Sequence, residues 1–217
     1  RTLLFLSLCH TIVIDQKKGT YNAASPDELA LVNAAKQFGY EFKGIDKNDK
    51  MSIWNKYTDK LMKYQLLHVC EFNSTRKRMS VILKDQDGKI ILISKGADSV
   101  IMERLSEESK NGEVLQRTQE YVDICANEGL RTLFLAERVI DSWEYQEWEK
   151  QAQKAKLAVN NRDELVAEAD EIIEKDLELV GSTAIEDRLQ DQVADTIQFM
   201  KKAGIKVWVL TGDKIET

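Results

Sequence analysis

The sequence is poor in proline, cysteine and histidine, and it has no long apolar run. Its 217 residues include one proline, Pro26, and no stretch rich in glycine and serine, so no flexible linker is predicted. The three cysteines, Cys9, Cys70 and Cys125, lie far apart and form no CxxC motif, which favours reduced thiols in a cytosolic setting over a disulfide framework. No segment approaches the ~18–20 consecutive apolar residues of a transmembrane helix.

A basic surface and the common nucleotide-binding fingerprints are missing as well. The net charge of −6 argues against nucleic acid as a partner. Neither G-x-x-x-x-G-K-[ST] nor G-x-G-x-x-G occurs, which excludes a P-loop and a dinucleotide fingerprint. His68 and Cys70 have no second pair of metal ligands within reach by sequence, so a structural role is favoured over a zinc site. The basic run Arg76-Lys77-Arg78 is most simply a solvated loop.

The elements of a globular chain can be placed from their patterns. Hydrophobic residues make up 43% and charged residues 31%, which is enough for a substantial core. Ser25 and Pro26 mark the start of a helix that Gly39 ends. Three alternating segments separated by polar turns predict a β-meander. The meander strands are expected at 64–72, 79–84 and 89–95, helices at 99–105, 113–127 and within 143–178, a further strand at 130–140, and an apolar segment of either type at 3–14.

The pattern changes near residue 179. A strand at 179–185, a helix at 190–202 and a strand at 205–210 predict a βαβ unit of the parallel, doubly wound kind. We therefore expect an α/β (α+β) chain in which residues 1–178 form an antiparallel sheet flanked by helices. Residues 179–217 then form a partial second domain. Both ends of the chain look cut, which is typical of an excised fragment of a longer protein.

The meander places two candidate binding residues together. Phe72 ends its first strand and Lys95 ends its third, so both lie at the same edge of the sheet, about 10 Å apart. An aromatic face and an ammonium at that separation could bracket a flat purine, and Gly96 would allow close approach of the backbone. Taken singly, each residue has a simpler interpretation, because a Phe at a strand end is often core and a Lys there is often a solvated edge charge.

Other candidates are equally open when taken one by one. Glu28 is explained as the last residue of a capping box, and Arg131 as a partner in a surface salt bridge. Thr211, Gly212 and Asp213 follow a buried-strand run at its carboxyl end, where open α/β sheets bind ligands. A Thr hydroxyl and free backbone amides there could hold a phosphoryl oxygen, although a plain turn from strand to helix has similar composition.

Six segments, in order along nearly the whole chain, resemble one family. They are similar to the type IV P-type ATPases, the phospholipid flippases. This resemblance implies a nucleotide-binding domain followed by part of a phosphorylation domain with a haloacid-dehalogenase-like fold. The segments are Ser25-Pro26-Asp27-Glu28, residues 71–80 (EFNSTRKRMS), Lys95-Gly96-Ala97-Asp98, residues 129–133 (GLRTL), residues 185–191 (IEDRLQD) and residues 203–214 (AGIKVWVLTGDK).

The resemblance also implies a role for each candidate residue. By the family pattern, Glu28 would meet the adenine amino group, Phe72 would stack on the ring, and Lys95 would line the pocket. Arg131 would reach the phosphates, and its planar fork suits two oxygens better than Lys would. The remaining residues would serve the γ-phosphate side of ATP (Thr211, Gly212 and Asp213) and the join between the two domains (Asp187).

What the parent protein does follows only from the resemblance. It would couple ATP hydrolysis, through an aspartyl-phosphate, to phospholipid translocation, with Mg²⁺ as the cofactor. The acceptor segment DKTGT does not occur here and would precede Arg1, while the magnesium-binding segment would follow Thr217. We therefore expect no catalytic residue in this chain and ATP binding without turnover.

The resemblance further implies a cytosolic domain of an integral protein of the plasma, Golgi or endosomal membrane. Its partners would be ATP, a phospholipid substrate handled by the membrane domain, and an accessory subunit of the flippase family, with no nucleic acid. Two alternatives stay open from the sequence: a non-catalytic nucleotide-binding or interaction module, and a fragment of a phosphatase with the haloacid-dehalogenase fold.

Overall fold

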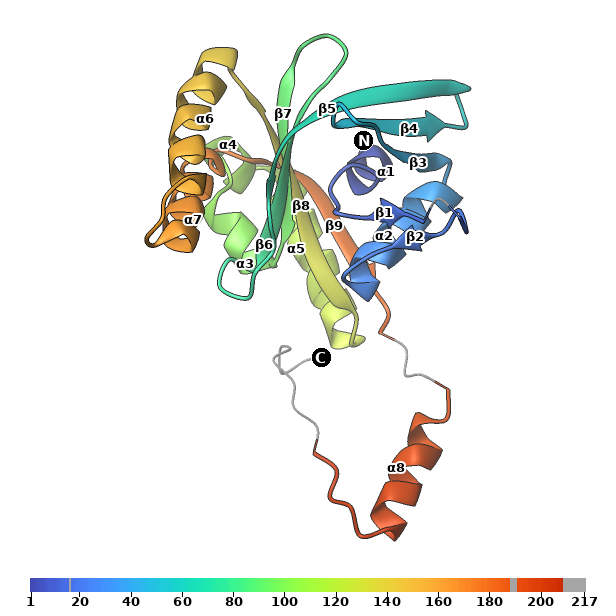
Figure 1. Ribbon diagram of the computed structural model, residues 1–217. Coiled ribbons are helices and arrows are strands. Elements are labelled where there is room, and N and C mark those ends of the chain that lie inside the picture. The colour runs from blue at the N-terminus through green and yellow to red at the C-terminus, as the bar shows by residue number, and fades with distance from the viewer. Residues whose placement is uncertain (16, 188–190, 209–217) are drawn as a thin grey trace.

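The chain is built around one antiparallel sheet. A computed structural model describes residues 1–15, 17–187 and 191–208. Seven strands follow one another in sequence order across the sheet, each antiparallel to the next (Figure 1). They are β3 (Tyr40–Ile45), β4 (Lys50–Asn55), β5 (Lys60–Cys70), β6 (Arg78–Lys84), β7 (Ile90–Gly96), β8 (Arg131–Ile140) and β9 (Glu178–Ile185); a separate hairpin pairs β1 (Val13–Ile14) with β2 (Tyr21–Asn22).

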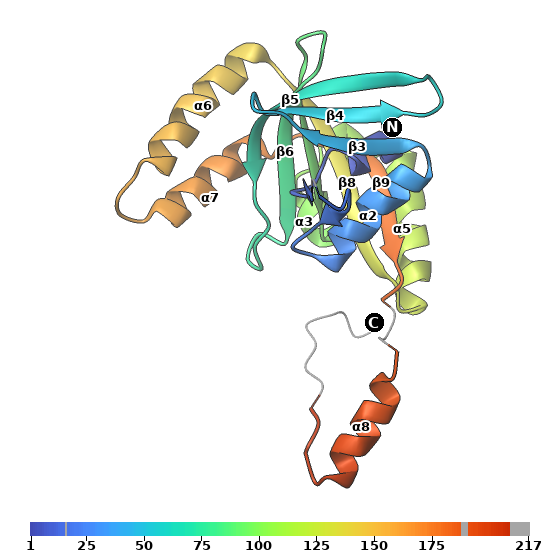
Figure 2. The same ribbon diagram turned by 45° about the vertical axis from the view of Figure 1, so that its right-hand side comes forward.

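Helices cover both faces of this sheet, as the two views in Figures 1 and 2 show. The first two helices pack on one face, and the helices inserted between β7 and β9 pack on the other. The described helices are α1 (Thr2–Leu6), α2 (Pro26–Gln37), α3 (Asp98–Glu103), α4 (Glu107–Lys110), α5 (Glu113–Asn127), α6 (Ser142–Lys156), α7 (Arg162–Ile173) and α8 (Val193–Lys202). The predicted fold class, an antiparallel sheet flanked by helices, is confirmed.

The predicted meander is β5–β6–β7. Its second turn forms for local reasons: the carboxylate of Asp85 accepts the backbone N–H groups of Asp87 and Lys89, and Gly88 takes a φ of +86°. A register shift between Leu66 and His68 marks a bulge in β5. Because a bulge bends its strand, the sheet can curl toward β3 and β4, two strands that the sequence analysis did not identify.

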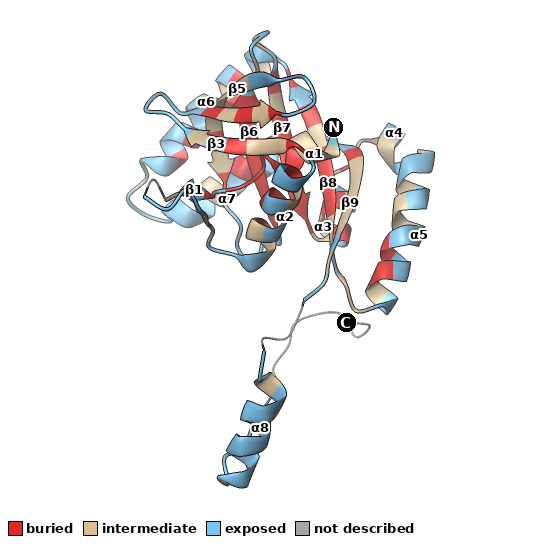
Figure 3. Cartoon of the chain, turned by 90° about the vertical axis from the view of Figure 1, so that its right-hand side faces the viewer, coloured by how far each residue is buried: buried red, intermediate tan, exposed pale blue. Residues whose placement is uncertain are grey.

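The central strands alternate between two cores. In β7, Leu92 points into the core under α3 to α7, while its neighbour Ile93 points into the core under α1 and α2. In β8, Phe134 and Leu135 divide in the same way. This alternation follows from the two-residue period of a strand. Figure 3 shows the buried residues concentrated along these strands.

The prediction of a parallel βαβ unit is wrong in its first strand. β9 runs antiparallel to β8, with Thr132 opposite Ala184 and Leu135 opposite Gly181, so it is the seventh strand of the main sheet. An apolar run predicts a strand but does not identify the strand that pairs with it. Here the partner of β9 is β8, which precedes the α6–α7 hairpin in the sequence. Residues 205–208 form no strand, and 209–210 lie outside the described residues.

The predicted helix at 190–202 is confirmed as α8, but it stands apart from the sheet (Figures 1 and 3). None of its residues is buried, and Phe199 and Met200 are exposed. In the part of the chain that the structure describes, no helix combines the length and apolar character needed to cross a membrane.

Candidate binding site at one edge of the sheet

A buried ion pair joins α2 to the end of β7. The ammonium of Lys95 lies 3.3 Å from the carboxylate of Glu28, and the two side chains are 10% and 9% exposed. Glu28 stands in the first turn of α2, yet it does not act as a cap, and the side chain of Ser25 makes no capping hydrogen bond either. The capping-box interpretation of Glu28 is therefore wrong. The interpretation of Lys95 as a solvated edge charge is wrong as well.

Thr11 holds the Glu28 carboxylate from the other side. Its backbone N–H donates to Oε1 and its hydroxyl donates to Oε2, both at 3.1 Å. The carboxylate is therefore fixed between an ammonium and two neutral donors, which offsets part of the cost of burying the charge. No sequence signal pointed to Thr11, because its contact with Glu28 depends on how the chain packs before α2.

The wall beneath this pair is neutral. His10 donates from Nε2 to the carbonyl of Ser7 and accepts the N–H of Ile12 at Nδ1, an arrangement that suits the uncharged ring. Burial lowers the pKa of His10 to about 4. Burial also raises the pKa of the Cys9 thiol to about 12. Neither group carries charge near pH 7, so these two neighbours of the Glu28–Lys95 pair are neutral.

Phe72 lies at the same edge, as the meander geometry predicts. Cys70, the last residue of β5, pairs with Ser80, and Met79 pairs with Lys95, so Phe72 follows β5 where β7 ends. The Phe72 residue is 65% exposed. It is therefore not a core residue, and an exposed ring of this size is free to stack on a planar ligand.

Gly96 is required by the neighbouring strand. A Cβ at this position would come within 2.5 Å of the Cβ of Arg78 and 2.8 Å of the carbonyl oxygen of Lys77. The close approach that we expected for a ligand is thus made by β6. Lys77 itself is exposed, takes a φ of +50°, and accepts the N–H of Ala97 at 3.0 Å. This backbone contact brings Lys77 opposite Ala97, two residues along the chain from Lys95. The sequence pattern indicates only a solvated loop for Lys77.

Arg131 links three elements at this edge. It opens β8, and its Nη1 lies 3.4 Å from the carboxylate of Asp27 on α2 and 3.8 Å from that of Asp187, just after β9. The Arg131 side chain is partly exposed, so these ion pairs contribute little to stability and could exchange for another anion. Thr211, Gly212 and Asp213, the other predicted site residues, lie outside the described residues.

Behind the meander, the face that meets α7 carries a second set of charges. Arg76 donates to Asp170 at 2.7 Å and to Glu174 at 2.6 Å, and Arg78 donates from Nε to Glu174 at 2.8 Å. Both arginines are buried, so the prediction of a solvated loop is wrong for them. No local pattern indicates that these arginines are buried, because their carboxylate partners lie more than 90 residues away on a helix predicted to lie at the surface.

The charges of this network depend on one another. Burial alone would raise the pKa of Glu171, but hydrogen bonds from Arg78 and Arg104 lower it below its usual value. Burial opposes the charge of Arg78, yet the nearby carboxylates of Glu174 and Glu171 raise its pKa overall. Arg78 and Glu171 therefore both carry their charge near pH 7, and their ion pair helps to fasten β6 to α7.

The described residues 1–15, 17–187 and 191–208 contain one cluster of potential metal ligands, formed by His68, Cys70 and Asp170. Their donor atoms lie within 4.8 Å of one another, beside a cavity of about 450 Å³. Cations already occupy two of the three: Arg76 pairs with Asp170, and the Lys156 ammonium donates to Nδ1 of His68 at 3.0 Å. A divalent ion would be repelled there, which supports the structural role predicted for His68 and Cys70.

Comparison with known proteins agrees with the motif pattern. The family model "P-type ATPase, cytoplasmic domain N" matches residues 1–192. The chain is 48% identical to phospholipid-transporting ATPase DRS2 of Saccharomyces cerevisiae, a match that covers 99% of the chain and 16% of that protein. It is 49% identical to phospholipid-transporting ATPase IC of Homo sapiens, over 98% of the chain and 17% of that protein.

Plants have similar proteins too. Phospholipid-transporting ATPase 10 of Arabidopsis thaliana is 46% identical over 98% of the chain and 18% of its own length. The chain thus spans about a sixth of the length of the curated relatives it matches. The motifs, the helix-flanked antiparallel sheet and the family match agree: the chain belongs to the P-type ATPase family, as a cytoplasmic domain N.

Proposed function

We propose that this chain is the ATP-binding part of a P-type ATPase that moves phospholipid across a membrane. The parent enzyme would pass through an aspartyl-phosphate whose acceptor is not among these residues, and this chain alone would bind ATP without turnover. The support is the family match together with the names of the similar proteins. The domain would face the cytosol, and an accessory subunit would belong to the parent.

One observation carries the proposal of ATP binding: the buried Glu28–Lys95 pair lies at the same sheet edge as the exposed Phe72. A carboxylate accepts hydrogen bonds, so Glu28 can accept one from the exocyclic amino group of adenine. The ring of Phe72 can stack on the base, and Lys95 can donate from the second side of the pocket. Ligand sites commonly combine aromatic surface with a few polar groups that fix the orientation of the ligand, and this edge offers both.

The phosphate end of the ligand would lie toward Arg131. The Arg131 guanidinium pairs with Asp27, which is partly exposed, and with Asp187, which is exposed, and a phosphate could replace either carboxylate as its partner. Thr211, Gly212 and Asp213 would hold the terminal phosphate in a second domain, which would begin after Ile185 because β9 belongs to the sheet. Asp187 would then stand at the join between the domains.

Magnesium is expected with the nucleotide, but the described residues do not build a site for it. The His68, Cys70 and Asp170 group is paired with cations and mixes nitrogen and sulfur with oxygen, whereas Mg²⁺ prefers oxygen ligands. The residues of this chain would bind and orient the nucleotide.

An NMR titration tests this function. ATP added to the labelled chain is expected to shift the backbone amides of Glu28, Phe72, Lys95 and Arg131 together. GTP is the matched control ligand, because guanine presents a carbonyl oxygen to the Glu28 carboxylate where adenine presents an amino group. We expect GTP to bind at least about tenfold more weakly. Shifts confined to other regions, or equal affinity for the two nucleotides, would contradict the proposed site.

A further inference from the structure

Phe72 leads into a turn with its own internal hydrogen bonds. The side-chain oxygen of Asn73 accepts the N–H of Thr75 at 3.0 Å and that of Arg76 at 2.7 Å, and the carbonyl of Asn73 accepts the N–H of Lys77 at 2.9 Å. The turn is therefore a compact unit. Whatever fixes one end of it also fixes the backbone that enters it from Phe72.

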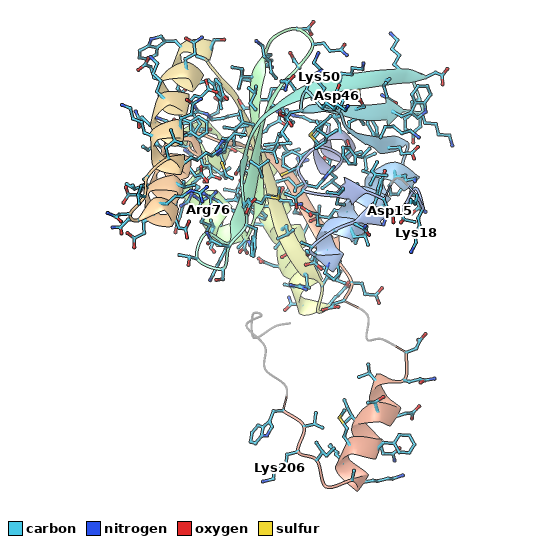
Figure 4. The ribbon with its side chains drawn as sticks, viewed as in Figure 1. Asp15, Lys18, Asp46, Lys50, Arg76 and Lys206 are labelled. Atoms are coloured by element: carbon cyan, nitrogen blue, oxygen red, sulfur yellow. The ribbon has the colours of Figure 1, made fainter. Side chains whose placement is uncertain are left out.

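Arg76 fixes that turn from the far face of the sheet. Its side chain is 7% exposed and lies between β6 and α7, where Figure 4 labels it. Two of its nitrogens reach separate carboxylates, those of Asp170 and Glu174, which are themselves 5% and 0% exposed. A guanidinium held by two buried carboxylates is constrained in direction as well as in position, because its donors are coplanar.

The two carboxylates that hold Arg76 are themselves held by further contacts. Glu174 also accepts hydrogen bonds from Arg78 and from the hydroxyl of Ser80, both on β6, and Asp170 also pairs with Nε2 of His68 on β5. The α6–α7 hairpin, which carries the carboxylates, adds apolar contacts to the same core through Trp148 and Ile173. The anchor of the turn is thus rigid on both sides, while Phe72 is exposed.

We infer that Arg76 is a positioning residue for base recognition: its buried ion pairs with Asp170 and Glu174 hold the turn that follows Phe72, and so hold the ring in the orientation that stacks on the base. The α6–α7 hairpin thereby controls adenine binding although it lies on the opposite face from Glu28 and Lys95. This inference rests on the proposed function, since it assigns the aromatic ring to stacking.

Asp170→Asn tests the inference. This variant keeps the shape of the side chain and removes one of the two carboxylate charges that face Arg76. Glu171→Gln is the matched control: it removes a charge from the next residue of α7, one that pairs with Arg78 and Arg104 but not with Arg76. Calorimetric titration with ATP is expected to show about three- to tenfold weaker binding for Asp170→Asn and less than twofold change for Glu171→Gln.

A double-mutant cycle with Phe72→Ala separates positioning from general destabilisation. If Arg76 acts through the ring, Asp170→Asn changes the ATP affinity by less than twofold once the ring is gone. Equal losses in both backgrounds, or wild-type affinity of a folded Asp170→Asn chain, would overturn the inference. If Asp170→Asn does not fold, Arg76→Lys replaces it in the same cycle. Arg76→Lys keeps the positive charge but removes the planar set of donors that reaches both carboxylates. A Phe72→Ala variant with unchanged affinity would instead refute the proposed function.

Discussion

Replacing Phe72 with alanine separates stability from binding more cleanly than any other change to the site. The residue is 65% exposed, so only about a third of its surface is covered in the folded chain. Full burial of a Phe side chain stabilises a protein by roughly 1.5–3 kcal/mol, and a third of that is about 0.5–1 kcal/mol. The free energy of unfolding should therefore fall by no more than about 1 kcal/mol.

The loss of binding should be larger. Stacking of a base on an aromatic side chain is worth about 1–3 kcal/mol, which corresponds to an approximately 5- to 150-fold weaker ATP affinity in Phe72→Ala. Isothermal calorimetry measures this affinity, and urea unfolding followed by circular dichroism measures the stability. Trp143→Ala is the matched control, since Trp143 is a 71% exposed aromatic residue on α6.

The comparison between these two variants decides the outcome. Trp143→Ala should bind ATP as the original chain does. If Phe72→Ala also binds ATP as the original chain does, or if the two variants weaken binding equally, then the ring does not contact the base and the proposed site is refuted.

Three further outcomes are expected. In Gly96→Ala, the added methyl group meets the Cβ of Arg78 at 2.5 Å, so urea unfolding should show a loss of about 1–3 kcal/mol, and unchanged stability would mean that β6 and β7 are further apart. Glu28→Gln removes the carboxylate that pairs with the buried ammonium of Lys95 and should cost roughly 3 kcal/mol by the same assay; a loss below about 1 kcal/mol would argue against a buried pair. Because burial lowers the pKa of His10 to about 4 while the unfolded chain titrates near 6.5, the unfolded chain binds this proton more readily. The free energy of unfolding should then fall by about 3 kcal/mol as the pH drops from 6.5 to 4, and His10→Asn should flatten that part of the profile; an equally steep profile in the variant would exclude His10 as the cause.

What could be predicted from the sequence is what local chemistry determines. The turn at residues 85–88 forms from its own Asp and Gly, so the order of strands in the meander follows, and with it the shared edge of Phe72 and Lys95. The pairing partner of β9 could not be predicted in the same way, because no residue within β9 shows whether it pairs with β8 or with a strand of another domain. The pairing of β9 with β8 depends on the chain between them, which folds back as the α6–α7 helical hairpin.

The roles of the charged residues were hardest to predict. Glu28 fits a capping pattern by its spacing, but its carboxylate is used by Lys95 and Thr11, which lie far from it in sequence. Arg76 looks like a loop residue until α7 brings Asp170 and Glu174 to it. In each case the partner comes from a distant segment, so the residue type is visible in the sequence while its ion pair is created only by tertiary packing.

The covering of the central strands on both faces has a consequence for motion. Backbone amides in β7 and β8 should exchange with solvent deuterium only through global unfolding, since each strand is shielded by helices on either side. Lys95 and Arg131 stand at the ends of these strands. The strands that support this edge would thus already be ordered before a ligand binds. The conformational entropy lost on binding would then come mainly from the ligand.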